Sequence, residues 1–472
     1  MRVSGCLWLL AWLSLFTGGC SRTEVPEFSQ AEWQPGGKMT HKRLSKRSYV
    51  FAGQAASKQQ QLDFWTGFSL FRDPWVIAPS STKDRDGLGP LFNARSCIAC
   101  HSDGSRGKMS QSGESLPTSL VLRVGSTTIA NYANNHAYGG QIQPRAIRFN
   151  QGEAQHKPQG EAWLQLDESV ERSSFADGEN YQLTRPHYQL TKMAFGPLPE
   201  QVTVSPRLSP NIYGVGLLDA ISEQDLLQQE DIADSDKDGI SAKYNRVLDV
   251  ITGELLIGRF GLKAKQPSLK QQIAAAFRDD IGITNNLFTE ESCTQQQVNC
   301  QRAAKIGGHS SVEIPDKLLN LVVSFNRLLG VPPARDLEQK EVQHGRALFY
   351  QSGCHLCHTP SYDIAEDYPD AAIAGQKIWP YTDLALHDMG TDLADGMLEF
   401  DAFGQEWRTP PLWGIGLQAD IVGEQRLLHD GRARSVSEAI LWHGGEAEQS
   451  RQYFIQLNQA ERQALVRFVN SI

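Results

Sequence analysis

The stretch Phe349–His358 has the sequence Phe-Tyr-Gln-Ser-Gly-Cys-His-Leu-Cys-His, and its last five residues form a C-x-x-C-H pattern. Two thiols three positions apart on one turn can both bond to the vinyl groups of a single haem, and the adjacent His can reach the iron. The pattern therefore predicts covalent haem attachment through Cys354 and Cys357, with His358 as an axial ligand.

A second copy of the pattern lies upstream, at Cys97-Ile98-Ala99-Cys100-His101. Leu91-Phe92 precede it by the same interval that separates Leu348-Phe349 from the downstream copy, which indicates an internal repeat. We expect a second covalent haem on Cys97 and Cys100, with His101 on its iron. The alternative is one structural zinc held by the four cysteines, but this leaves both trailing histidines without a role.

The N-terminus is typical of an export signal rather than of folded structure. Arg2 is followed by the apolar run Leu7–Phe16, which is too short to cross a bilayer, and then by the small residues Thr17-Gly18-Gly19-Cys20. Residues 1–19 are predicted to be a signal peptide. Cleavage before a cysteine resembles a bacterial lipoprotein signal, so Cys20 is expected to carry a lipid anchor at the periplasmic face of a membrane; the alternative is ordinary cleavage, with Cys20 a free thiol or lost.

The composition is that of a soluble globular protein with two or more domains. The chain has 472 residues, of which 40% are hydrophobic and 21% charged. Removing Arg2 with the signal takes the formal net charge from −9 to −10. This acidic balance argues against a nucleic-acid partner.

Cys293 and Cys300 remain once the four haem cysteines, Cys20 and Cys6 of the signal peptide are accounted for. In an oxidising compartment they should form a disulfide. Closing so short a loop contributes about 2–3 kcal/mol in the loop-entropy model. We interpret the pair as a local staple, with a redox role as the alternative.

The pattern along the chain predicts a mainly α fold with two cytochrome c-like domains. Residues 20–50 are expected to form a solvated tether, and an amphipathic helix over 59–72 begins an N-terminal haem domain at 51–330. Alternating apolar residues predict a small antiparallel β-rich insertion at about 116–206. A helix over 316–329 closes this domain, and a similar apolar spacing near the C-terminus closes the second domain, at 335–472.

Asp234, Asp236 and Asp238 precede Gly239 at the alternate positions that begin an EF-type calcium loop. The twelfth position is Asn245 rather than Glu, so a looser calcium loop is the hypothesis. The alternative is an acidic surface turn.

Several further passages carry a family resemblance. They are Gly89–Asn93 leading to Cys97, Ile257–Gly261 with Lys263-Ala264, Leu386–Gly390, Arg408–Leu412, and His429–Gly431 with Glu438–Ile440. From about residue 85 to the C-terminus the chain resembles the bacterial di-haem cytochrome c peroxidase superfamily, and most closely its di-haem oxidoreductase branch of peroxidase-like and thiol oxidoreductase-like proteins.

The resemblance implies one low-spin haem that accepts electrons from a small periplasmic protein, and one haem at which peroxide or another small-molecule oxidant or reductant meets iron. In the peroxidases a Met fourteen residues after the His of a His-Asp-Gly turn is the second ligand of the C-terminal haem. The same offset from His429 leads here to His443, which implies bis-histidine ligation and a lower haem potential. His387 and Met389 are the rival ligands.

For the N-terminal haem the sequence does not select a sixth ligand among His136, His187 and Met193, and no catalytic acid or base can be assigned. Three functions stay open. The first is a periplasmic di-haem oxidoreductase that reduces peroxide, or oxidises a substrate, at the N-terminal haem. The second is a pure electron-transfer cytochrome, and the third is a haem-containing accessory lipoprotein, for example in iron handling.

Overall fold

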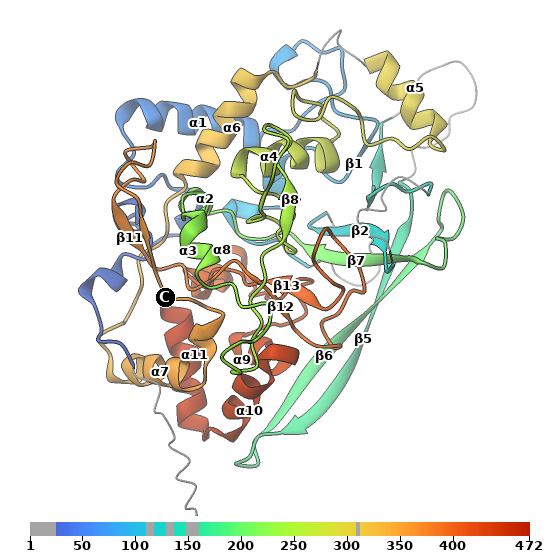
Figure 1. Ribbon diagram of the computed structural model, residues 1–472. Helices are drawn as coiled ribbons and strands as arrows, with labels where there is room; N and C mark the ends of the chain where they lie inside the picture. Colours follow the sequence, from blue (N-terminus) through green and yellow to red (C-terminus); the bar gives the residue numbers. More distant parts are fainter. Residues whose placement is uncertain (1–24, 110–117, 129–135, 148–159, 308–311) are drawn as a thin grey trace, which may run out of the picture.

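The computed structural model describes residues 25–109, 118–128, 136–147, 160–307 and 312–472. Two pairs of crossing helices lie in it, one near the top and one near the bottom of Figure 1. The upper pair is α1 (Lys58–Arg72) against α6 (Asp316–Leu328), and the lower pair is α7 (Lys340–Gln351) against α11 (Gln459–Ser471). The helices predicted near 59–72 and 316–329 are thereby confirmed, as is the helix near the C-terminus.

Local sequence explains where these helices begin and end. Ser57 caps α1 by accepting from the backbone N–H of Gln60, whose side chain accepts in return from the backbone of Ser57. Asn458 and Glu461 form the same reciprocal cap on α11. Such caps satisfy N–H groups that have no partner inside the helix. The remaining helices are shorter: α2 (Val215–Asp219), α3 (Glu223–Leu227), α4 (Leu269–Ala276), α5 (Val298–Gly307), α8 (Gln418–Val422), α9 (Val436–Trp442) and α10 (Glu448–Gln456).

The described strands form six small antiparallel sheets. They are β1 (Leu91–Phe92) with β4 (Arg145–Ala146); β3 (Gln141–Ile142), β2 (Leu120–Ser126) and β7 (Val202–Leu208); β5 (Trp163–Ser174) with β6 (Asn180–Thr191); β8 (Arg246–Leu248) with β9 (Leu255–Ile257); β10 (Tyr362–Ile364) with β11 (Gln376–Ile378); and β12 (Leu386–Asp388) with β13 (Glu406–Arg408). Six of the strands, β2 to β7, fall in the region where antiparallel strands were expected.

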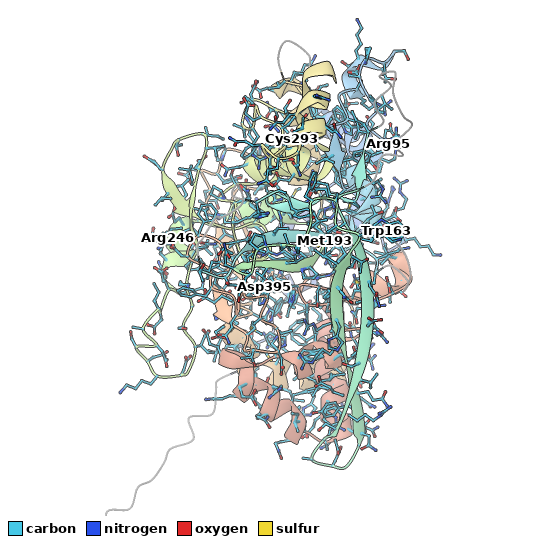
Figure 2. All side chains as sticks on the ribbon, turned by 90° about the vertical axis from the view of Figure 1, so that its right-hand side faces the viewer. Arg95, Trp163, Met193, Arg246, Cys293 and Asp395 are labelled. Atoms are coloured by element: carbon cyan, nitrogen blue, oxygen red, sulfur yellow. A yellow bond between two sulfur atoms is a disulfide. The ribbon has the colours of Figure 1, made fainter. Side chains whose placement is uncertain are left out.

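The long β5–β6 hairpin runs down one side of the molecule, from the level of β2 and β7 to that of α10 (Figure 1). Figure 2 looks at that side, with Trp163 and Met193 at the end of the hairpin where it joins the body. Arg434 pairs with Glu168 of β5 at 2.9 Å, and Arg462 pairs with Asp177 of the hairpin turn at 2.9 Å. These contacts fix the hairpin along the C-terminal half.

The prediction of a mainly α fold with two cytochrome c-like domains is wrong. The chain is 32% helical and 19% strand, and the strands occur on both sides of residue 330. One hydrophobic cluster also crosses the expected boundary, because Tyr49 and Phe325 share it with Tyr362 and Trp413. The described part of the chain therefore does not separate into two small helical units, and the domain bounds stay a prediction.

The expectation of a solvated tether is also wrong for residues 25–50. Met39 and Tyr49 have no exposed surface, and the Tyr49 hydroxyl donates to the carbonyl of Gly414 at 2.6 Å. Glu32 forms a buried ion pair with Arg346 of α7 at 3.0 Å. Proline, glycine and basic residues give this segment the composition of a loop, but its few apolar residues, such as Met39 and Tyr49, are buried in the core. Within the described ranges, no helix has the length and apolar character needed to cross a bilayer.

Candidate haem sites

The downstream C-x-x-C-H turn follows directly after α7. Gly353 adopts the left-handed conformation, with φ of 79°, and turns the chain from α7 into a 3-10 turn at Cys354–Leu356. A residue with a side chain is strained in this conformation, which explains the glycine. Cys354, Cys357 and His358 all line one cavity. The local fold therefore presents both thiols and the histidine to the same space.

His358 is held in the form that can bind iron. Its Nδ1 donates to the carbonyl of Tyr381 at 3.0 Å, so the lone pair lies on Nε2, which hydrogen bonds to no described residue. Burial lowers the pKa of His358 to about 4, which keeps the imidazole neutral at physiological pH. A histidine ligand needs this neutral form, with its other nitrogen fixed by a backbone carbonyl.

His443 has the same arrangement on the same cavity. It caps the C-terminus of α9, and its Nδ1 donates to the carbonyl of Ala439 at 2.6 Å. Burial lowers its pKa, and His443 contributes electrostatically to the lowered pKa of His358. The structure thus brings together the two histidines expected to ligate one iron.

His387 lines the cavity but has no free ring nitrogen. Its Nε2 lies 2.8 Å from Asp383 and its Nδ1 lies 2.7 Å from Glu446. Burial alone would lower the pKa of His387, but Asp383, and after it the thiol of Cys357, raise that pKa well above its usual value. As placed, both ring nitrogens of His387 are hydrogen bonded to carboxylates, which makes it a weaker candidate than His443, and the identity of the ligand stays a prediction. Met389 also lines the cavity and remains the other rival.

The cavity contains about 1520 Å³ of space free of protein atoms, part of it open to solvent. Its walls are mostly apolar, with a few convergent polar groups, as expected of a cofactor pocket. The lining includes Leu262, Phe349, Leu393, Trp407, Leu412, Ile415, Leu427, Val436, Ile440, Leu465 and Val469, together with Arg106, Arg408 and His429. Two thiols, two neutral imidazoles and apolar walls fit a haem attached by thioether bonds.

The upstream motif has the same local geometry. The backbone N–H of His101 donates to the carbonyl of Cys97 at 2.9 Å, as that of His358 does to Cys354 at 2.9 Å. His101 donates from Nδ1 to the carbonyl of Pro210 at 2.8 Å, and burial lowers its pKa to about 4. This histidine is therefore also neutral and oriented. The one group of three or more His, Cys, Asp or Glu found in metal-binding geometry within the described ranges contains no cysteine, which does not support the zinc alternative.

The three candidates for a sixth ligand at the upstream site lie in different settings. His136 is buried, and its Nδ1 accepts from the backbone N–H of Tyr138. His187 is exposed on β6, 2.7 Å from the hydroxyl of Ser169. Met193 follows β6 and is half-buried. The exposed position of His187 makes it the poorest candidate, and the choice between the others stays open.

Asp234, Asp236 and Asp238 do come together, with carboxylate oxygens within 4.8 Å of one another. They lie on an exposed turn and accept hydrogen bonds from the loop's own backbone, including that of Gly239 at 3.2 Å. Calcium binding stays a prediction. Cys293 and Cys300 are joined by a disulfide, with their Cα atoms 5.7 Å apart.

A buried charge cluster next to Trp407 was not anticipated. Lys263 pairs with Asp395 at 2.9 Å and Arg207 pairs with Glu399 at 2.6 Å, and both cations lie over the Trp407 ring. Lys263 belongs to one of the passages that carry the family resemblance, and this passage could have indicated from sequence that the residue is important. Arg207 and Asp395 had no local pattern.

Comparisons with known proteins agree with this chemistry. The family model described as "Di-haem oxidoreductase, putative peroxidase" matches residues 135–472, which is more than half of the chain. The chain therefore belongs to this di-haem oxidoreductase family. The resemblance inferred from the motifs is confirmed, and membership implies haem cofactors.

No curated protein matches the sequence. Among solved structures, a chain of hydrazine synthase from Kuenenia stuttgartiensis, pressurised with xenon, is 16% identical with a TM-score of 0.23. The match covers 38% of this chain and 63% of that one, so the chain spans less than two thirds of its length. A likeness this weak carries no argument about fold or function.

Proposed function

We propose that this family member is an exported c-type oxidoreductase with two covalent haems, which reduces peroxide at the N-terminal haem with electrons passed through the C-terminal haem. The single observation that carries the proposal is the cavity beside α7. There Cys354 and Cys357 adjoin two neutral histidines, each oriented by a backbone carbonyl.

The residues of each motif have separate tasks in this proposal. Cys354 and Cys357 would hold one haem by thioether bonds, and His358 and His443 would provide nitrogen ligands for its iron. Cys97 and Cys100 would hold the other haem, with His101 as a ligand of its iron. Bound haem supplies an iron that exchanges single electrons and that reacts with small molecules where a coordination position is open.

The two sites differ in what the chain offers to a sixth position. His443 is built into the downstream cavity, which suits a six-coordinate electron carrier. For the upstream motif the choice of a sixth ligand between His136 and Met193 is open, and an open position on that iron would suit a reactive site. Reduction of one peroxide to two waters consumes two electrons and two protons. A small periplasmic electron-transfer protein would deliver these electrons singly.

The location is part of the proposal. Residues 1–19 and Cys20, on which the signal peptide and lipid anchor are inferred, lie outside the described residues. Export is supported by the disulfide between Cys293 and Cys300 and by the two haem-attachment motifs, because disulfides persist in oxidising compartments.

Haem content is the first test. A pyridine haemochrome assay and intact mass should give two haems per chain. The double variants Cys97→Ala/Cys100→Ala and Cys354→Ala/Cys357→Ala should each lose one haem. Cys293→Ala/Cys300→Ala, the matched control, should retain both. Fewer than two haems in the unaltered protein would refute the proposal.

Spin state and reactivity are the second test. Electron paramagnetic resonance of resting and half-reduced protein should find one iron that is high-spin or becomes so. Stopped-flow mixing should then show rapid oxidation by peroxide. Two permanently low-spin irons, inert to peroxide in every redox state, would favour a pure electron carrier instead.

A further inference from the structure

Two arginines line the downstream cavity without an acidic partner. Arg106, five residues after His101, is 6% exposed. Its Nη2 donates to the carbonyl of Leu428, and its Nε is buried without a hydrogen-bond partner. A buried donor left without a partner costs about 1–3 kcal/mol, and more when the group is charged, so a missing acceptor is indicated at this position.

Arg408, the last residue of β13, is the second. It is 9% exposed; its Nε donates to the carbonyl of Gly261 at 3.0 Å and its Nη1 to that of Thr409 at 3.0 Å. Its Nη2 hydrogen bonds to no described residue. Two neutral carbonyls orient this guanidinium but do not neutralise its charge.

The lack of an ion pair distinguishes these two residues from other buried arginines. Arg207 pairs with Glu399 at 2.6 Å, and Arg346 pairs with Glu32 at 3.0 Å. In the part of the chain that the structure describes, neither Arg106 nor Arg408 forms such a pair. Burial lowers the pKa of each to about 10, so both stay charged at neutral pH. A buried, unpaired cation is costly, and an anion in the cavity would offset that cost.

We propose that Arg106 and Arg408 bind the two propionate carboxylates of the haem assigned to this cavity, an inference that rests on the proposed function. The match is chemical: haem brings two carboxylates into an otherwise apolar space, and a guanidinium binds a carboxylate with paired N–H donors. Two uncompensated cations thus meet two anions.

The same assignment links the two haem sites. Arg106 donates its backbone N–H to the side chain of Asn211 at 2.8 Å, and Asn211 also lines the downstream cavity. The preceding residue, Pro210, accepts the hydrogen bond from His101. A carboxylate of one haem would therefore lie at the end of a short connected path from the axial histidine of the other.

The reduction potential of the C-terminal haem tests the assignment. A cation beside a propionate stabilises the less positive, reduced iron, so Arg106→Gln and Arg408→Gln should each lower that potential. Loss of the cation also raises the propionate pKa, so the potential should become more dependent on pH. Arg106→Lys and Arg408→Lys, which keep the charge, should shift it less. Propionate bands in resonance Raman spectra should move in the Gln variants.

Arg259→Gln is the matched control, because Arg259 is half-buried, donates to backbone carbonyls such as that of Ile221 at 2.5 Å, and does not line the cavity. It should leave the potential and the Raman bands unchanged. The number of haems per chain is measured on every sample. Failure of the unaltered protein to bind two haems would refute the proposed function, and this result is distinct from failure of the present inference. Unchanged potentials and bands in variants that retain two haems would overturn it. So would a potential that falls on addition of chloride in the unaltered protein and not in the Gln variants, which would indicate a site for a dissolved anion.

Discussion

Gly345 of α7 lies directly against the backbone of Ala464 in α11, so closely that a Cβ at position 345 would overlap the Ala464 carbonyl oxygen. The same relationship recurs in the other helix pair, where a Cβ on Gly67 of α1 would overlap the carbonyl oxygen of Leu321 in α6. In each case the side chain four residues further on, Phe468 or Phe325, lies 2.9 Å from the added atom. The two pairs are therefore built on one repeated close crossing.

Gly67→Ala and Gly345→Ala should each destabilise the protein. Alanine favours a helix over glycine by about 1 kcal/mol, but here the added carbon must separate two packed helices, and overpacking of this kind costs about 1–3 kcal/mol or more. Urea unfolding of both variants should show a lower midpoint. Thr66→Ala and His344→Ala, at exposed neighbouring positions, should show no decrease. Equal or higher stability of the glycine variants would contradict the close crossing.

His443→Met should raise the reduction potential of the C-terminal haem while keeping that haem low-spin. A thioether ligand favours the reduced iron more than an imidazole does. Spectroelectrochemical titration measures the change, and a new band near the thioether-to-iron charge-transfer region would identify the ligand. An unaltered spectrum and potential would reassign the position to Met389, and Met389→Leu is the variant that then decides it.

His387→Gln should lower stability and leave the haem spin state unchanged. The imidazolium lies between Asp383, which is 1% exposed, and Glu446, and its removal leaves two carboxylates without a cation. Breaking a buried ion pair costs about 3–5 kcal/mol. Thermal unfolding and absorption spectra together give the result, with the exposed His344→Gln as control. Conversion of the C-terminal haem to high-spin would instead make His387 a ligand.

Glu161→Gln should flatten the dependence of stability on pH. Burial raises the pKa of Glu161 to about 8, against 4.5 for an ordinary Glu, despite hydrogen bonds from Gln143 and Gln297. Between these values the folded protein holds a proton that the unfolded chain releases, so stability falls as the pH rises, by at most about 1.4 kcal/mol per pH unit.

Urea midpoints at pH 5, 6, 7 and 8 should therefore decline for the unaltered protein and decline less for Glu161→Gln. Glu200 is exposed, so the urea midpoints of Glu200→Gln should depend on pH as those of the unaltered protein do. Parallel curves for all three proteins would show that Glu161 ionises normally.

The features that the sequence predicted well are those encoded in short patterns. The two C-x-x-C-H turns have one backbone geometry, and the apolar spacing of the closing helices matches α6 and α11. His443 was predicted from a fixed offset within a family motif, and in the structure it lines the same cavity as His358. Local patterns identify such residues because each pattern is contiguous.

The features that could not be predicted from the sequence depend on contacts between residues far apart in the chain. Strands β10 to β13 have three residues each and are formed by their partners rather than by alternation. Segment 25–50 has a loop-like composition, yet Glu32 and Tyr49 bind residues more than 300 positions away. Arg106 has no pattern of its own, and only the fold places it in a cavity that belongs mostly to the other half of the chain.

The packing of the N-terminal segment determines how near the proposed lipid would hold the protein to its membrane. Val25 already contacts the core of the C-terminal half, and Pro26 accepts a hydrogen bond from Arg346 of α7. Five residues from Cys20 to Val25 span at most about 18 Å. A lipid on Cys20 would thus hold α7 close to the lipid headgroups. Electron donors would then have to reach the protein along the bilayer surface or at the faces that do not lie against the membrane.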